Sequence, residues 1–260
     1  MANKFAIVTG ASTGIGFELA SLAAEAGYDL LVAANEPLID AAAADFETHG
    51  VDVVSVEADL ATVEGVDRLF AACEGRQVDL LCANAGHGLG GAFLEQDFAA
   101  YRHVIDTNIT GTIYLLQKVL QPMVARGEGK VLVTGSIAGY IPGTFHAVYN
   151  ASKAFVDNFT EALRAELKDH DGTTLTTLMP GATETEFFDR ANMLDTKIGQ
   201  AKKDDAGKVA RDGWDALFTG KGHVVSGLMN KAQVAASGVL PQSALAAQHG
   251  KMAERGSADA

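Results

Sequence analysis

The chain has 260 residues, and its 33 acidic and 20 basic side chains give a formal net charge of −13. All of this excess lies in residues 1–100, which hold 16 acidic and three basic residues, while the rest sums to zero. This balance argues against a basic face for nucleic acid or for an anionic membrane. No window approaches 18 consecutive apolar residues, so we expect no membrane-spanning helix.

Cysteine content and the first residues bear on the compartment. Cys73 and Cys82 are the two cysteines, and no pair has the spacing of metal ligands. We expect buried free thiols, compatible with a reducing cytoplasm, and no metal site. The chain runs from Met1 almost directly into an apolar segment, so a signal peptide is not expected.

Short apolar runs alternate with longer helical patterns along the chain. Several runs are apolar at consecutive positions, which is typical of parallel strands covered by helices on both faces. Strands are predicted at Phe5–Thr9, Leu30–Ala34, Asp52–Glu57, Leu80–Ala83, Lys130–Gly135, Thr174–Met179 and His223–Ser226.

Helical patterns fill the intervals between these strands. Three of them close at a glycine, a common helix stop. The pattern at about Phe98–Arg126 contains Pro122, so we expect that helix to end or bend near the proline. The predicted helices are Gly14–Ala26, Pro37–His49, Val63–Glu74, about Phe98–Arg126 and about Tyr149–Lys168.

The repeated alternation predicts a doubly wound α/β fold, with a parallel sheet of about seven strands between two helical layers. No linker or low-complexity tract divides the chain, so we expect one domain over residues 1–260. Residues 185–212 break the rhythm, which is typical of a mobile surface loop or of a lid over a site. The small, polar tail at about 245–260 is expected to be frayed.

A glycine-rich loop joins the first predicted strand to the first helix. It reads Thr9-Gly10-Ala11-Ser12-Thr13-Gly14-Ile15-Gly16. Glycines here allow a tight turn and let backbone N–H groups approach a pyrophosphate at the helix N-terminus. The GxxxGxG spacing matches the general dinucleotide fingerprint only in part, and a turn without a ligand is the alternative. The position between strand and helix favours the binding role.

Two further features follow the third and fourth strands. Asn84-Ala85-Gly86 comes after the fourth strand, which neighbours the first across the switch point where ligands bind. Asn84 could brace the strand or lie beside the adenosine half of a dinucleotide. Asp59 could accept a hydrogen bond from an adenine amino group or cap the next helix.

Tyr149 and Lys153 lie four residues apart at the start of a predicted helix, so they share one helical face. A nearby cation lowers the pKa of a phenol from about 10 into the range useful for acid–base catalysis. Such pairs are also common by chance. Ser136 ends the fifth strand, where its hydroxyl can donate to a carbonyl oxygen. Asn108 could bend the long helix, hold a water that connects to Lys153, or make an internal packing hydrogen bond.

Together these motifs resemble the short-chain dehydrogenase/reductase family in order and spacing. The motifs are Gly10-xxx-Gly14-x-Gly16, Asn84-Ala85-Gly86, Asn108, Ser136, Tyr149-xxx-Lys153 and Pro180-Gly181. The resemblance covers residues 5–186 closely and the remainder loosely. It implies a Rossmann-type domain that binds NAD or NADP and acts as an alcohol dehydrogenase or carbonyl reductase on CH–OH groups.

The resemblance also implies roles for single residues. Tyr149 would act as general acid or base, Ser136 would polarise the substrate oxygen, and Asn108 would support a proton-relay water. Lys153 would lower the pKa of Tyr149 and hold the nicotinamide ribose. The implied cofactor contacts are Gly10, Ser12, Thr13, Gly14, Ile15, Gly16, Ala34, Asn35, Asp59, Leu60, Asn84, Ala85, Gly86, Tyr149, Lys153, Pro180, Gly181, Thr183 and Thr185.

The end of the second strand bears on the choice of cofactor. An acid there usually binds the ribose 2′-OH of NAD, whereas an arginine accommodates the 2′-phosphate of NADP. Ala34 occupies that position and Thr13 is also neutral, so a 2′-phosphate would meet no obvious counter-ion. We therefore favour NAD(H), with NADP(H) as the alternative. Glu36 is a candidate ribose contact or, alternatively, a solvated loop acid.

The substrate and the partners are only outlined by the sequence. Four residues suggest an apolar pocket wall and favour a hydrophobic carbonyl or secondary alcohol: Phe145, Met179, Phe187 and Phe188. His87 and His146 could line the pocket or be surface or capping residues. The resemblance implies a homodimer or homotetramer that pairs through the two long helices. A catalytically silent dinucleotide-binding regulator or scaffold is the alternative function, and the four occupied catalytic positions argue against it.

Overall fold

A seven-stranded sheet forms the centre of the computed structural model, which describes residues 3–170 and 172–259. The strand order is β3-β2-β1-β4-β5-β6-β7, and each neighbouring pair is parallel. All predicted strands are confirmed to within one residue at each end. They are β1 (Phe5–Thr9), β2 (Asp29–Ala34), β3 (Val53–Glu57), β4 (Leu80–Ala83), β5 (Gly129–Thr134), β6 (Thr173–Met179) and β7 (His223–Val225).

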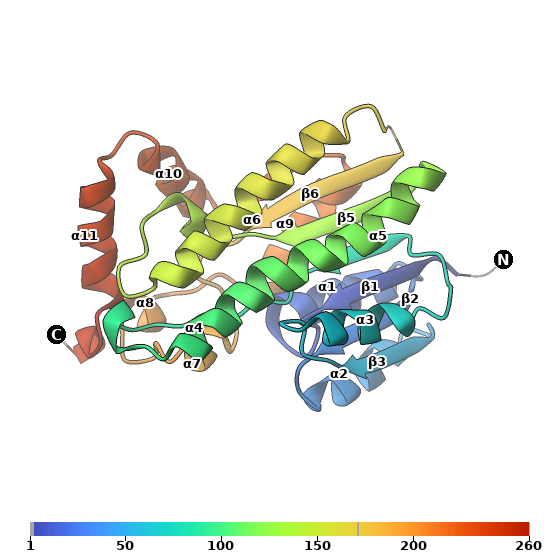
Figure 1. Cartoon of the computed structure of the whole chain (residues 1–260), viewed down its shortest axis with the longest axis horizontal. Coiled ribbons are helices and arrows are strands. Elements are labelled where there is room, and N and C mark those ends of the chain that lie inside the picture. Colours follow the sequence, from blue (N-terminus) through green and yellow to red (C-terminus); the bar gives the residue numbers. More distant parts are fainter. Residues whose placement is uncertain (1–2, 171, 260) are drawn as a thin grey trace.

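Helices cover both faces of the sheet (Figure 1), so the predicted three-layer α/β/α fold is confirmed. Consecutive strand residues point to opposite faces, and this explains the unbroken apolar runs. Ile7 packs into one core and Val8 into the other. One face carries α1 (Gly14–Glu25), α2 (Leu38–Glu47) and α9 (Ala206–Phe218), and the other carries α3 (Val63–Ala71), α5 (Thr112–Arg126) and α6 (Ala147–Glu166).

The long helix predicted at about Phe98–Arg126 consists of three segments. Helix α4 (Phe98–Ile105) passes into a π-helical segment, Asp106–Gly111, and then into α5. Pro122 lies inside α5, which continues to Arg126 before Gly127 takes a left-handed conformation with φ of 71°. The interruption therefore falls at the π-helix, ahead of the proline.

Part of the segment after β6 lies at the same end of the molecule as α10 and α11 (Figure 1). Its irregular part contains the short helices α7 (Phe187–Arg190) and α8 (Lys197–Gln200) and ends where α9 begins, at Ala206, so it is shorter than expected. The remaining elements are α10 (Leu228–Ser237), α11 (Gln242–Ala253) and the 3-10 turns Phe93–Glu95, Ile137–Tyr140 and Ser257–Asp259.

The expected fraying of the tail is wrong for α11. Leu245, His249 and Ala253 are buried in it. Thr144 joins the helix to the loop before α6, because its hydroxyl donates to Ala246 O at 2.8 Å and its carbonyl oxygen lies 2.9 Å from His249 Nδ1. The sequence of α11 shows no clear apolar face. The contacts that bury it come from a loop about 100 residues away, so local sequence does not predict them.

Cys73 and Cys82 are buried free thiols, as expected. Within residues 3–170 and 172–259, no helix is long and apolar enough to cross a membrane. In the same part of the chain, no group of three or more His, Cys, Asp or Glu side chains is arranged to hold a metal ion.

Candidate active site

A cavity of about 1160 Å³ opens at the carboxyl ends of the strands. Parallel sheets of this kind bind ligands at that edge, where the strand order reverses between β1 and β4. The loops that follow six of the strands contribute lining residues, among them Ser12, Asn35, Asp59, Ala85, Ser136 and Gly181. The fold therefore brings the predicted phosphate loop and the predicted catalytic residues to one cavity.

The glycine-rich loop lies against neighbours that leave little room for side chains. A Cβ atom at Gly16 would lie 1.9 Å from Gly10 O. Gly14 has a left-handed φ of +58°, and a Cβ there would lie 2.6 Å from Thr185 Cγ2. Helix α1 begins at Gly14 with no side-chain cap and no acidic residue in its first turn. Its first N–H groups are thus free to bind an anion.

Asn84 links the ends of three strands. Its amide nitrogen donates to Thr9 O at 3.2 Å and to Gly10 O at 3.4 Å, and its amide oxygen accepts from Thr134 Oγ1 at 2.9 Å. The bracing role considered for this residue is therefore present. Asp59 accepts from Ala61 N at 3.0 Å, whereas Thr62 supplies the N-cap of α3, so Asp59 is not that helix's cap.

Ser136, Tyr149 and Lys153 line the same part of the cavity. The Lys153 ammonium lies 5.9 Å from the centre of the Tyr149 ring and donates to Thr134 O at 2.8 Å. Ser136 Oγ donates to Pro180 O at 3.4 Å and accepts from Ala138 N at 3.1 Å. The strand end, the start of α6 and the segment after β6 thus position these three side chains together.

The ionisation of Tyr149 and Lys153 is governed by burial. Burial raises the pKa of Tyr149 above its ordinary value, and the neighbouring Ser136 hydroxyl opposes this shift only in part. Burial likewise lowers the pKa of Lys153, against the charge of Asp157 one turn further along α6. Burial of the phenol thus outweighs the lowering of its pKa expected from Lys153, whose role stays a prediction. The reason is that the ammonium is directed at the Thr134 carbonyl while the phenol is desolvated.

Asn108 lies in the π-helical segment and is 1% exposed. Its amide oxygen accepts from His87 N at 2.7 Å, and its amide nitrogen donates to His87 O and to Ser152 Oγ, both at 2.9 Å. A Cβ atom at Gly86 would lie 3.4 Å from both Asn108 Oδ1 and Lys153 Nζ. Asn108 therefore joins the loop after β4 to helix α6 close to the lysine, through internal packing hydrogen bonds.

Beyond Tyr149 the cavity is walled by apolar and imidazole groups. The His146 ring stacks on Tyr149 with centroids 4.5 Å apart, and Phe187 lies 4.9 Å from the same tyrosine ring. Burial lowers the pKa of His146 to about 3, so this imidazole is neutral. The apolar wall consists of Ile141, Phe187, Phe188, Met229, Leu240, Leu245 and Met252.

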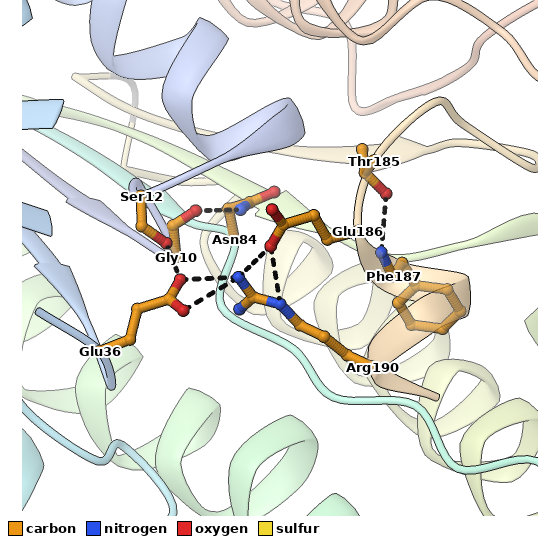
Figure 2. A network of polar contacts seen from close by, with 8 residues as sticks. All are labelled: Gly10, Ser12, Glu36, Asn84, Thr185, Glu186, Phe187 and Arg190. Atoms are coloured by element: carbon orange, nitrogen blue, oxygen red, sulfur yellow. Dashed lines mark hydrogen bonds and ion pairs between the residues drawn. The ribbon is translucent and has the colours of Figure 1, made fainter. Parts of the chain in front are cut away.

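An ion pair joins two of the segments that line the cavity (Figure 2). Arg190 Nη2, from the short helix α7, lies 2.8 Å from Glu36 Oε1 and 3.0 Å from Oε2. Glu36 Oε1 also accepts from Ser12 Oγ at 2.5 Å, and Glu186 accepts from Arg190 Nε at 3.1 Å and from the same Nη2. Glu36 is thus not a solvated loop acid, because it links the phosphate loop to α7.

Comparison with known proteins agrees with this arrangement. The family model described as short chain dehydrogenase matches residues 4–194. The chain belongs to the short-chain dehydrogenase/reductase family of oxidoreductases. It is 37% identical over 192 residues to an uncharacterised oxidoreductase of Myxococcus xanthus (strain DK1622), an alignment that covers 72% of this chain and 75% of that protein.

Two solved short-chain dehydrogenases, each 25% identical to this one, resemble the structure closely. The enzyme from Burkholderia phymatum, in complex with NAD, superposes with a TM-score of 0.82 over 90% of this chain and 92% of its own. The enzyme from Sphingobium yanoikuyae, in complex with NADPH, has a TM-score of 0.80 over 92% and 97%. The family uses nicotinamide cofactors, and these two neighbours hold different ones.

Most residues predicted for the site of this short-chain dehydrogenase line the cavity. The exceptions are Gly16 and Asn108, which are both buried. Of the four residues predicted for the pocket wall, Phe187 and Phe188 line the cavity, whereas Met179 is buried beside Tyr140 and Phe145 packs behind α7.

Sequence reasoning missed Arg190 and the wall supplied by α10 and α11. Arg190 is 154 residues from Glu36, and no local pattern marks the pair. Leu245, His249 and Met252 occur at i, i+4 and i+7, which is a helical face and could have indicated that α11 covers a cavity.

Proposed function

We propose that this short-chain dehydrogenase transfers a hydride between a nicotinamide cofactor and a carbonyl or secondary alcohol carbon. One observation carries the proposal. An uncapped helix N-terminus behind a glycine loop shares a cavity with Ser136, Tyr149 and Lys153. A purely dinucleotide-binding protein would need the first feature and not the second.

The cavity fits a dinucleotide at the phosphate loop. The free N–H groups at the start of α1 suit a pyrophosphate, and Gly14, which lines the cavity, puts no side chain in its way. Residues after β2, β3 and β4 would hold the adenosine half, and Thr183 and Thr185 would hold the nicotinamide end. When bound, the cofactor supplies the hydride or accepts it.

Tyr149 and Ser136 supply the proton chemistry in this proposal. Their hydroxyl groups would both face the reacting oxygen, where negative charge develops during reduction of a carbonyl. Burial keeps the Tyr149 phenol protonated, which is the form that donates a proton to that oxygen. Lys153 would orient the nicotinamide ribose and favour return of the proton. The apolar wall around Phe187 excludes water from the reacting oxygen.

The lining also supports a class of substrate and a preferred cofactor. Ile141, Phe187 and Leu245 favour an apolar carbonyl or secondary alcohol over a polyol. Ala34 and Thr13 offer no cation for a 2′-phosphate, and Arg190 is engaged by two carboxylates. We therefore favour NAD(H) over NADP(H).

The proposal is tested by titrating the full chain with NADH and with NADPH, by calorimetry. A panel of apolar ketones and secondary alcohols is then screened with the better ligand, following absorbance of the reduced nicotinamide. We expect binding of at least one dinucleotide and turnover of an apolar member of the panel. Failure to bind either dinucleotide would overturn the proposal.

A further inference from the structure

Glu36 and Arg190 form an ion pair beside the phosphate loop (Figure 2), and both line the same cavity as the proposed catalytic groups. Glu36 follows the end of β2 and stands 20 residues after Gly16. In dinucleotide-binding folds, an acid about 20 residues beyond the glycine motif binds the 2′-hydroxyl of the adenosine ribose. The hydrogen bond from Ser12 holds the Glu36 carboxylate beside the phosphate loop. Glu36 thus lies where the adenosine ribose would bind, a place that we call the ribose edge. It is two residues beyond Ala34, the position expected to hold this acid.

Arg190 brings a cation to that same edge from a distant part of the chain. Both oxygens of Glu36 lie within 3.0 Å of Arg190 Nη2. Glu186, one helical turn before Arg190, receives hydrogen bonds from the guanidinium through Nε at 3.1 Å and through Nη2. Arg190 is the one arginine among the described residues that line the cavity.

The balance of charge at this edge is negative. One guanidinium serves two carboxylates, and both carboxylates line the cavity. Burial alone would raise the pKa of Glu36, but the Ser12 hydroxyl and Arg190 outweigh it and hold that pKa below its ordinary value. Glu36 is therefore ionised at neutral pH. It can accept from a ribose hydroxyl, and it repels a 2′-phosphate.

We propose that the Glu36–Arg190 ion pair determines the choice between NAD(H) and NADP(H). Glu36 accepts the ribose hydroxyl of NAD(H) and occupies the guanidinium that would otherwise bind a 2′-phosphate. Removal of Glu36 leaves Arg190 with Glu186 as its one carboxylate partner and frees donor capacity on the guanidinium for that phosphate, a group that arginine binds well. This inference rests on the proposed function, because it requires that the cavity take a dinucleotide.

The test is the ratio of the dissociation constants for NADPH and NADH, measured by calorimetry on the full chain. The variants are Glu36→Gln, Arg190→Gln and the double variant. In Glu36→Gln we expect the ratio to fall about tenfold or more, in favour of NADPH. In the double variant we expect most of this change to disappear, because the released cation is gone. Arg190→Gln alone should not move the ratio towards NADPH.

Asp189→Asn is the matched control. It removes one negative charge from the same short helix at an exposed position that does not line the cavity, and its ratio should equal that of the wild type. Circular dichroism and thermal unfolding confirm that each variant is folded.

Three results would overturn the inference. The ratio could stay unchanged in Glu36→Gln, it could change equally with and without Arg190, or it could change as much in Asp189→Asn. Each of these leaves the proposed function intact. If the wild type bound neither dinucleotide, the proposed function would fail as well, so the two failures are distinguishable.

Discussion

Tyr149 lies where burial and neighbouring groups act on the phenol in opposite directions. Burial dominates and raises its pKa, while the Ser136 hydroxyl opposes the shift. The Lys153 ammonium, one turn away, donates to the Thr134 carbonyl at 2.8 Å. A helical i, i+4 spacing therefore brings the two groups near each other without determining the sign of the pKa shift, which depends on desolvation and on competing acceptors.

Asn108 provides a second test at the scale of one residue. In Asn108→Ala, the backbone groups of His87 and the Ser152 hydroxyl lose their amide partner in a buried region. We expect the free energy of unfolding to fall by about 2–4 kcal/mol, measured by urea denaturation. Thr110→Ala, at an exposed position of the same π-helix, should change it by less than about 0.5 kcal/mol.

A different result would point to another role for Asn108. If Asn108→Ala lost activity while it kept wild-type stability, the packing account would be wrong and a water relay to Lys153 would explain the loss better.

Much of this site can be predicted at the residue scale because its motifs are local. The glycine loop, Asn84 and the Tyr149–Lys153 pair each lie within one strand–helix unit. Glu36 and Arg190 could not be paired in the same way. Their contact depends on how the segment after β6 folds back over β2, and this is a tertiary effect with no periodic signal.

At the scale of elements, the phosphate loop and the segment after β6 touch through Gly14 and Thr185. Gly14→Ala introduces a methyl group 2.6 Å from Thr185 Cγ2, at a left-handed φ. We expect the free energy of unfolding to fall by about 1–2 kcal/mol from backbone strain. We also expect affinity for NADH to fall about tenfold, since the loop and Thr185 must separate.

Gly27→Ala is the control at the other end of α1. Gly27 has a φ of +81°, and a Cβ there would meet no atom within 4 Å. It should lose similar stability and keep wild-type affinity for NADH by calorimetry. Equal affinity in both variants would mean that the Gly14–Thr185 contact has no part in cofactor binding.

The elements themselves differ in how well the sequence predicts them. The strands are continuous apolar runs that are buried on both faces, and all of them were predictable. The π-helix at Asp106–Gly111 has no sequence pattern of its own, and it forms where Asn108 bonds to the loop after β4. Helix α11 is rich in small residues, and its burial depends on Thr144, so its composition suggested a frayed tail.

At the scale of the whole molecule, the net negative charge lies in the first hundred residues, which supply the phosphate loop and the loops after β2, β3 and β4. The acidic first hundred residues contain three Lys and Arg side chains, and none of the three lines the cavity. Arg76 pairs with Asp29, Lys4 pairs with Glu128, and Arg68 donates to Glu57 O. The cation at the ribose edge comes from the second half of the chain. This distribution supports a preference for NAD(H) that one ion pair controls.

The faces of α4 and α6 lead to a prediction of assembly. Phe98, Ile105 and Phe155 are exposed by 61%, 37% and 40% on these adjacent helices. We expect a homodimer or homotetramer, with a mass by light scattering of two or four times 27.1 kDa. Phe155→Glu should shift the population towards monomer, because a charge would replace an aromatic group in the interface. A wild-type monomer at micromolar concentration would contradict this expectation.

The most direct test of the central claim compares the wild type with Tyr149→Phe in the hydride-transfer assay and in NADH binding. Phenylalanine keeps the ring between His146 and Phe187 but removes the proton that the proposal transfers. We predict that kcat falls about a hundredfold or more while NADH affinity stays within about threefold of the wild-type value. Wild-type turnover in Tyr149→Phe would contradict the account.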